Sequence, residues 1–181
     1  MEKNAPVNLQ PDLLEDELVR LVPLQASDFD RLFKVASDPL IWEQDPNRDR
    51  YKKEVFQIYF DSAVSSGSAF LIFDKKTNIL IGSSRFYDYD AEGSSIAVGY
   101  TFLAKEYWGG KYNRSVKKLM LDYAFQFVDA VIFHIGPSNI RSQKAILKIG
   151  ANKIGEMLYE GKLHFVYHVK SCDLLKENHN Y

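Results

Sequence analysis

The sequence predicts a single α/β domain in which seven strands and about four helices follow the order β-α-α-β-β-β-α-β-α-β-β. Large apolar residues alternate with mostly smaller ones from Ser95 to Leu103, which predicts a strand. After the glycines that follow, apolar residues recur at spacings of three and four, which predicts a helix through Val116, Leu119, Met120, Tyr123 and Phe127. Short, turn-forming links at residues 74–78 and 90–93 predict that three consecutive strands form an antiparallel meander.

The first half of the chain is expected to begin with a loose arm over residues 1–17, because this stretch is mixed polar and acidic. A single domain then covers residues 18–181. Its first strand spans residues 18–24, a helix capped by Ser27 ends at Asp38-Pro39, and a second helix covers residues 50–65. The meander follows at residues 69–73, 79–89 and 95–103.

The second half continues with the helix after Asn113 and then a buried strand over Ala130–Ile135. The next helix spans about residues 139–149, with Asn139 as its N-cap and Gly150 as its C-terminal stop. Two final strands, at residues 152–159 and 163–169, are joined across a short turn that contains Gly161.

Composition and charge exclude several classes of protein. Of the 181 residues, 46% are hydrophobic and 26% are charged, and the net charge of −1 gives no general attraction to nucleic acid or to an anionic membrane. No apolar run approaches the roughly 18 residues of a membrane span. Cys172 is the only cysteine, which fits a reducing compartment, and we expect a cytoplasmic protein. The four histidines have no compact ligand spacing with that cysteine, so we expect no metal site.

The run WGGKYN at residues 108–113 joins the strand that ends at Leu103 to the following helix. The first N–H groups of a helix lack intrahelical partners, and the helix dipole adds about half a positive charge there. Gly109 and Gly110 would let a phosphate approach the backbone, although the same pattern also fits an ordinary turn. A dinucleotide-binding Rossmann unit is not expected, because G-x-G-x-x-G is absent and the preceding strands have a hairpin pattern.

The order of elements, together with GYTFLAKEYWGGKYN (residues 99–113), the following RSVKKLMLDYAF and NIRSQKAILKIGA (residues 139–151), resembles the GNAT acyltransferase superfamily. The resemblance covers residues 18–169 and is nearest to the branch of ribosomal-protein N-terminal acetyltransferases. It implies a mixed, mostly antiparallel seven-stranded sheet, splayed open between the strands at residues 95–103 and 130–135, with acetyl-CoA lodged in the opening. It also implies direct transfer of an acetyl group from the thioester to an amine, without a covalent enzyme intermediate.

The resemblance further implies which residues bind acetyl-CoA. The family's phosphate loop, R/Q-x-x-G-x-G/A, is shifted here, with Trp108, Lys111 and Asn113 in place of its three defining residues. Backbone N–H donation survives this shift if Lys111 avoids a positive φ. Lys111 and Arg114 either attract phosphate or are solvated residues at the start of a helix. The implied cofactor-binding set is Phe102, Leu103, Trp108, Gly109, Gly110, Lys111, Tyr112, Asn113, Arg114, Asn139 and Ser142.

Ser142 is the implied catalytic residue, because it matches a position where related enzymes carry a serine proposed to protonate the thiolate. Asn139 matches an asparagine that hydrogen-bonds the pantetheine arm. The oxyanion donor is implied to be a backbone N–H near Phe102 or Leu103. The structural alternatives are a helix cap for Asn139 and a solvent-facing side chain for Ser142.

The general base is not identified by the sequence. Many relatives have Glu two residues before the Gly-Tyr pair, where this chain has Ala97, and Ile146 stands about where many other members have Tyr. The remaining candidates are Asp88, Tyr89, Tyr100 and His134. His134 equally fits a core histidine, and a base acting through water, or none, also remains open.

We therefore expect an acetyl-CoA-dependent N-acetyltransferase, monomeric or homodimeric, whose acceptor is a primary amine of a protein N-terminus, a peptide or a small metabolite. The alternative is a non-catalytic acyl-CoA-binding or interaction protein with a degenerate active site, which Ala97 and the shifted glycines favour. The loops at residues 40–50 and 160–163 are expected to shape the acceptor pocket, and their sequence carries no recognisable code for it.

Overall fold

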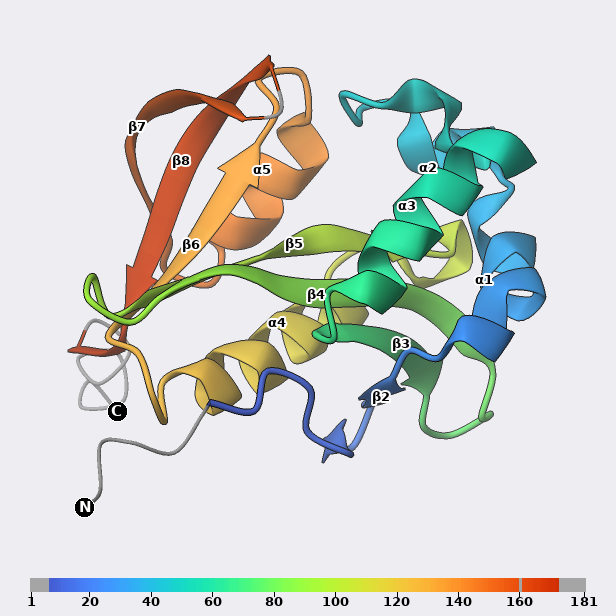
Figure 1. The fold of residues 1–181 in the computed structure, drawn as a ribbon, viewed down its shortest axis with the longest axis horizontal. Helices are drawn as coiled ribbons and strands as arrows, with labels where there is room; N and C mark the ends of the chain where they lie inside the picture. The colour runs from blue at the N-terminus through green and yellow to red at the C-terminus, as the bar shows by residue number, and fades with distance from the viewer. Residues whose placement is uncertain (1–6, 160, 173–181) are drawn as a thin grey trace.

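A computed structural model describes residues 7–159 and 161–172, and within them eight strands and five α-helices build one α/β unit (Figure 1). Three short 3-10 helices accompany them. The elements in chain order are β1 (Leu14–Glu15), β2 (Val19–Pro23), η1 (Ala26–Asp28), α1 (Phe29–Ala36), α2 (Pro39–Trp42), η2 (Arg48–Tyr51), α3 (Lys53–Ser65), β3 (Ala69–Asp74), β4 (Leu80–Asp90), β5 (Ser95–Leu103), η3 (Lys105–Tyr107), α4 (Lys111–Ala124), β6 (Ala130–Ile135), α5 (Ile140–Leu147), β7 (Asn152–Tyr159) and β8 (Lys162–Lys170).

All the strands form one sheet in the order β1-β2-β3-β4-β5-β6-β8-β7. Neighbours are antiparallel except β5 and β6, which are parallel, so the predicted mixed and mostly antiparallel sheet is confirmed. The α1–α3 region lies on one side of the sheet, and α4 lies on the other (Figure 1).

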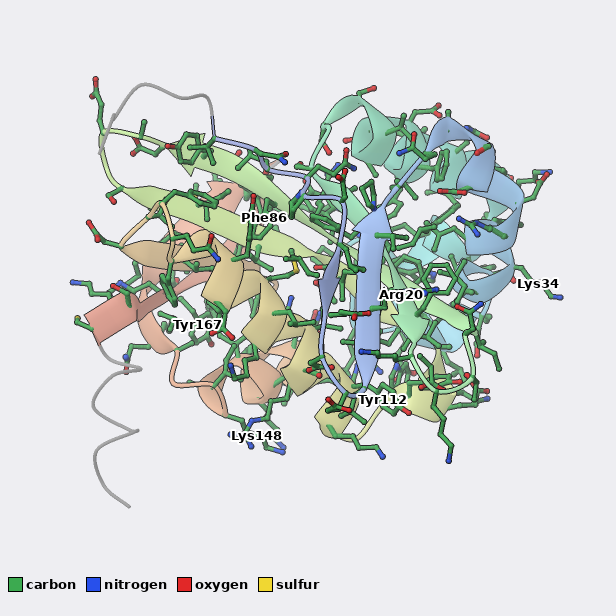
Figure 2. The ribbon with its side chains drawn as sticks, turned by 90° about the horizontal axis from the view of Figure 1, so that it is seen from below. Arg20, Lys34, Phe86, Tyr112, Lys148 and Tyr167 are labelled. Atoms are coloured by element: carbon green, nitrogen blue, oxygen red, sulfur yellow. The ribbon has the colours of Figure 1, made fainter. Side chains whose placement is uncertain are left out.

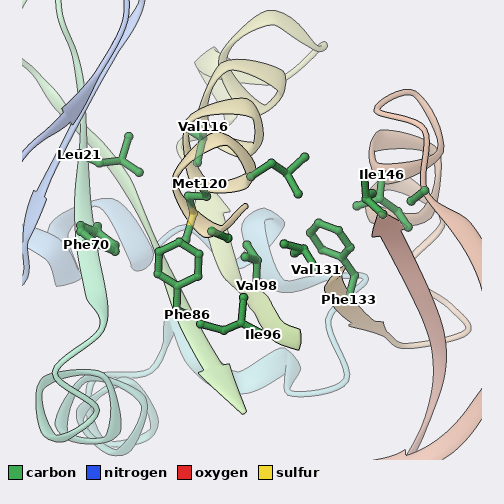
Figure 3. Packing of buried hydrophobic residues seen from close by; sticks show 14 of the residues in the cluster. Leu21, Phe70, Phe86, Ile96, Val98, Val116, Met120, Val131, Phe133 and Ile146 are labelled. Carbon is green, nitrogen blue, oxygen red and sulfur yellow. The ribbon is translucent and has the colours of Figure 1, made fainter. Parts of the chain in front are cut away.

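Two hydrophobic cores form because successive residues of a strand point to opposite faces of the sheet. In β3, Phe70 and Ile72 join the core under α4, whereas Leu71 and Phe73 join the core under α1 and α3. Figure 3 shows Val116 and Met120 of α4 above Phe86 and Val98 of the sheet, with Ile146 of α5 beyond Phe133. Each large side chain buried in this way stabilises the fold by about 1.5–3 kcal/mol.

The sheet opens at the only parallel pair among the described strands. The strands β5 and β6 pair over Ser95–Ala97 and Ala130–Ile132, and β5 then continues to Leu103 while β6 continues to Ile135. A β-bulge marks the start of the opening, because Tyr100 and Thr101 together lie opposite Ser84 of β4. The left-handed backbone of Tyr100, with φ of 51°, is uncommon for a residue with a side chain. It is held from the α3 side, where Tyr59 Oη donates to the Tyr100 carbonyl oxygen at 2.6 Å.

The N-terminal residues 7–17 differ from the loose arm that the sequence predicts. They contribute β1, an eighth strand, which pairs with β2. Gln10 Nε2 donates to the Ala69 carbonyl oxygen at 2.6 Å, Tyr123 Oη donates to the Asn8 carbonyl oxygen at 2.7 Å, and the Ser115 hydroxyl donates to the Asp16 carboxylate. Polar side chains that look solvated in the sequence thus bind groups far along the chain. Residues 1–6 of the expected arm lie outside the described residues.

The first helix also begins differently from its prediction. The Gln25 N–H donates to Asp28 Oδ2 at 2.8 Å, and the Asp28 N–H donates back to the Gln25 carbonyl oxygen at 3.0 Å, so this pair starts the helix in place of Ser27. Charged side chains such as Lys34 and Lys148 project from the periphery, whereas Phe86 and Tyr167 lie inside (Figure 2). None of the described helices has the length and hydropathy that crossing a membrane requires.

Candidate active site

A cleft of about 880 Å³ occupies the opening between β5 and β6. One wall comes from the second half of β5, the glycine turn and the first two turns of α4. The other comes from β6, the start of α5 and the β7–β8 hairpin, and residues 41–50 close one side. The described lining has one acidic residue, Asp45, and eight cationic residues: Arg50, Lys111, Arg114, Lys117, Arg141, Lys144, Lys148 and Lys162. This charge balance suits a ligand with several phosphates.

The glycine turn presents open backbone at the mouth of the cleft. Gly109 and Gly110 have φ of 98° and 128°, conformations that residues with side chains rarely adopt, which explains why glycine stands at these two positions. No atom lies within 4 Å of where a Cβ would be at either glycine. Lys111 is the first residue of α4 and has no positive φ, so the condition for N–H donation is met. The exposed Lys111 and Arg114 also line the mouth.

The other residues of the turn have different roles. Trp108 lines the cleft but is also braced, since its Nε1 donates to the Leu103 carbonyl oxygen at 2.9 Å and the Arg141 guanidinium stacks 3.8 Å from its ring. This brace links the two halves of the cleft. Tyr112 is not among the residues that line the cleft, and its ring packs edge-on against that of Tyr107. Its place in the cofactor-binding set stays a prediction. As the second residue of α4 it faces away from the opening, whereas Asn113 lines it.

Phe102 and Leu103 border the cleft mainly through their backbone. Their side chains are buried in the two separate cores, Phe102 under α3 and Leu103 under α4. Glycine at position 82 lets the neighbouring strand approach closely, because a Cβ there would lie 2.0 Å from the Phe102 carbonyl oxygen. The main chain of this part of β5 is therefore held firmly at the edge of the opening.

Asn139 and Ser142 meet at the start of α5, where both line the cleft. The Asn139 side-chain oxygen accepts the Ser142 N–H at 3.0 Å, so Asn139 does cap the helix. Its amide NH2 group remains a donor for a ligand, because an asparagine amide both donates and accepts. Ser142 is half-buried, and within the described residues its hydroxyl forms no hydrogen bond. Both the structural and the functional interpretation of Asn139 are therefore compatible with this geometry.

An aromatic cluster lines the α3 side of the cleft. A hydrogen bond of 2.9 Å joins Tyr87 Oη and His134 Nδ1, and the His134 ring stacks on Tyr159 with ring centroids 4.8 Å apart. Burial lowers the pKa of His134 and raises the pKa of Tyr87, so desolvation favours the neutral form of both groups. Tyr100 packs edge-on against Tyr87. The sequence singled out His134 and Tyr100 but missed Tyr87 and Tyr159.

The remaining base candidates do not reach the cleft. Asp88 and Tyr89 are exposed and do not line it. Ala97 is buried between Tyr87 of β4 and Ile132 of β6, and Ile146 is buried in the core under α4. Among the sequence candidates, the structure thus brings His134 and Tyr100 to the cleft.

Residues 41–47 bridge the two halves of the opened sheet. Lys162 Nζ donates to the Pro46 carbonyl oxygen at 2.7 Å, and the Arg141 backbone N–H donates to Gln44 Oε1 at 3.1 Å. Arg50 forms an ion pair with Asp45, with 3.1 Å between Nη1 and Oδ2. The Lys162 and Arg141 contacts join positions 116 and 97 residues apart in the chain, which is why the sequence predicted only that these loops shape the pocket.

Lys117 is a further cleft residue that the sequence analysis missed. It is buried on α4, and its Nζ donates to Thr101 Oγ1 at 2.6 Å. The sequence contains two adjacent lysines here, and only their placement on the helix separates the buried Lys117 from the exposed Lys118. Among the described residues no group of three histidine, cysteine or acidic side chains lies close enough together to hold a metal ion.

A mixed sheet opened at its one parallel pair, with a glycine turn and helix N-terminus at the mouth of the opening, defines the acetyltransferase class of α/β protein. The model of the acetyltransferase (GNAT) domain matches residues 19–152, and the chain belongs to this family. The resemblance noted from the sequence is thereby confirmed. A search of curated protein sequences found no match.

Solved structures share this fold at low sequence identity. A GCN5-related N-acetyltransferase from Brucella melitensis is 19% identical with a TM-score of 0.75, covering 91% of this chain and 82% of its own. Mycobacterium smegmatis RimJ in complex with CoA-disulfide is 15% identical with a TM-score of 0.68, covering 90% and 87%. Ribosomal-protein-S5-alanine acetyltransferase from Vibrio fischeri is 19% identical with a TM-score of 0.66, covering 90% and 98%.

Proposed function

We propose that this protein is an acetyl-CoA-dependent N-acetyltransferase that acts on a primary amine of a protein N-terminus, a peptide or a small metabolite. The observation that carries the proposal is a cleft that passes through the sheet. It has cationic side chains and open backbone N–H groups at one end, and a cluster of aromatic rings around a hydrogen-bonded histidine at the other. The first end suits a polyphosphate donor, and the second suits an amine that must lose its charge before it attacks.

We assign different roles to the residues at the two ends of the cleft. Gly109, Gly110 and the first turn of α4 hold the pyrophosphate, Lys111 and Arg114 add charge, and Asn139 binds the pantetheine arm through its amide. Bound acetyl-CoA supplies the activated thioester. Backbone N–H groups near Phe102 and Leu103 stabilise the oxyanion, and the Ser142 hydroxyl donates to the leaving sulfur. His134, whose ring is hydrogen bonded to Tyr87, is the candidate general base for the acceptor amine.

The second candidate is a non-catalytic acyl-CoA-binding protein, and one observation favours it: Ala97 is buried between neighbouring strands, with no carboxylate in place of the expected Glu. We also propose a cytoplasmic location, in keeping with the single cysteine, Cys172, and a monomer or homodimer.

Two measurements test the proposal. Calorimetry is expected to detect acetyl-CoA binding and much weaker binding of NAD or ATP; no heat or thermal shift with millimolar acetyl-CoA would contradict it. Thiol release is then assayed against a panel containing small amines and peptides with free N-termini. Binding of acetyl-CoA without thiol release for any acceptor would favour the non-catalytic alternative.

A further inference from the structure

Lys117 lies at the innermost end of the cleft. Its Nζ is hydrogen bonded to Thr101 of β5 at 2.6 Å and lies 5.5 Å from the centre of the Phe133 ring of β6. These two strands stop pairing at Ala97 and Ile132, only a few residues earlier. The amino group of Lys117 therefore sits between the two diverging strands, close to the point where the opening begins.

The environment of this amino group lacks a negative charge. Lys117 forms no ion pair within the described residues, and its hydrogen-bond partner, Thr101 Oγ1, is a neutral hydroxyl that also contacts Ser84 Oγ at 2.7 Å. Burial alone lowers the pKa of Lys117 from 10.5 to about 7. Among the described residues the ammonium form of Lys117 has no carboxylate partner, so an anionic ligand beside it would stabilise that form.

The other ionisable groups of the cleft do not supply that anion. Asp45, the one acidic residue of the described lining, is paired with Arg50. From β6, His134 points to the face opposite Phe133 and is bonded to Tyr87. On α4, Arg114 is exposed and cationic, and on α5, Lys144 and Lys148 are likewise exposed and cationic. From β4 and β5 the contacts are the hydroxyls of Ser84 and Thr101. An anion that pairs with the ammonium form of Lys117 would therefore come from a ligand.

We infer that Lys117 forms the binding site for the sulfur of coenzyme A and holds the thiolate that acyl transfer releases. This inference rests on the proposed function, because it takes the phosphates to bind at the start of α4. Acetyl-CoA that is bound by its phosphates at the start of α4 and extends into the cleft places its thioester at the inner end. The sulfur is the one atom of the thioester that is anionic in the product. Lys117 is six residues after the start of α4, about 9 Å further along the helix axis.

The proton balance follows from this placement. The acceptor nitrogen forms its bond to the acetyl carbon, and the C–S bond breaks with its electron pair on sulfur. Lys117 in its ammonium form pairs with the thiolate sulfur and keeps its proton. The proton lost by the acceptor nitrogen goes to solvent, and the sulfur takes a proton from solvent when coenzyme A leaves.

The test compares coenzyme A with desulfo-coenzyme A, which lacks the sulfur, by calorimetry on the full chain. Lys117→Met keeps the length of the side chain and removes its charge, and Lys118→Met makes the same change at the adjacent exposed lysine. We expect desulfo-coenzyme A to bind all three proteins alike. Coenzyme A should bind the parent and Lys118→Met at least about tenfold more tightly than Lys117→Met.

A spectroscopic readout accompanies the affinities. Coenzyme A bound to the parent at pH 8 should show the ultraviolet band of a thiolate, and the band should be absent with Lys117→Met. The role of Lys117 would be overturned, with the proposed function left standing, if the parent and Lys117→Met preferred coenzyme A over desulfo-coenzyme A by the same factor and gave the same spectrum. Binding of neither compound to the parent would instead refute the proposed function and this inference with it. Thermal unfolding checks the fold, and Lys117→Gln carries the same test if the methionine variant unfolds.

Discussion

The two ends of the cleft are built in opposite ways. The end near the start of α4 consists of main chain and helix starts, with Gly109, Gly110, Phe102 and Leu103 contributing backbone groups. The end near α3 consists of side chains, in which Tyr87, His134 and Tyr159 come from three different strands. Backbone groups can serve one common donor whatever the side chains are, whereas an acceptor must be recognised by side chains. Under the proposed function, this difference makes donor binding a property of the fold and acceptor choice a property of the side chains of this chain.

Lys117 is the exception on the donor side, and its removal should have the largest energetic effect. Its folded pKa of about 7 lies below its unfolded value of 10.5, so the native state binds fewer protons between these values. The stability of the parent should therefore rise as pH increases from 7 to 10.5. At pH 6.5 the free energy of unfolding of Lys117→Met, measured by denaturant titration, should exceed that of the parent by on the order of 3 kcal/mol. This difference should shrink toward pH 10.5. Lys118→Met is the control, and an unchanged difference across this range would contradict the buried-charge interpretation.

Ser142→Ala tests whether a side chain on the donor side also acts in the chemistry. A positioned proton donor contributes about 100-fold or more to the rate, and a serine that merely starts a helix contributes almost none. We expect slower single-turnover acetyl transfer with nearly unchanged acetyl-CoA affinity. Single-turnover measurement with a proven acceptor avoids masking by product release. A rate within about twofold of the parent would remove Ser142 from the mechanism.

Gly110→Val tests the assignment of the donor end to the backbone. At φ of 128° a β-branched residue is strained, by about 1–3 kcal/mol, and its side chain would occupy the space through which a phosphate approaches. We expect acetyl-CoA affinity to fall about tenfold or more in calorimetry. Gly67→Val is the matched control, because Gly67 also has positive φ with nothing within 4 Å but lies outside the cleft. If folded Gly110→Val and Gly67→Val bound acetyl-CoA with equal affinity, the glycine loop would be an ordinary turn with no role in binding.

Tyr87→Phe should have the smallest effect and should act on the other end of the cleft. It removes the hydroxyl bonded to His134 while keeping the ring that packs on Tyr100. We expect the KM for the acceptor amine to rise about fivefold, with acetyl-CoA affinity unchanged, because one hydrogen bond contributes about 1 kcal/mol. Tyr89→Phe, at an exposed position of the same strand, is the control. A change in acetyl-CoA affinity alone would contradict the division between the two ends.

The sequence signals at the α4 end of the cleft are local. Glycines before an amphipathic helix and Asn139 with Ser142 at the next helix start are short patterns, and the structure brings all of them to the cleft. Tyr112 lies away from the cleft although its neighbours line it, because consecutive residues of a helix point in different directions. The N-terminal arm was misjudged because residues such as Gln10 and Asp16 find their partners far along the chain.

By itself, the sequence determined the α/β class, nearly all of the strands and helices and the glycine turn, because periodicity and turn residues act over a few positions. The family resemblance implied where the sheet opens, whereas only the tertiary structure decided which of two adjacent lysines is buried and which aromatic residues meet across the opening. The pairing of β5 with β6 stops after three residues, and no local pattern records that. The burial of Lys117 and the contact between Tyr87 and His134 follow from that opening, since each joins residues from different elements. Their altered pKa values are consequences of desolvation, which exists only once the chain has folded around them.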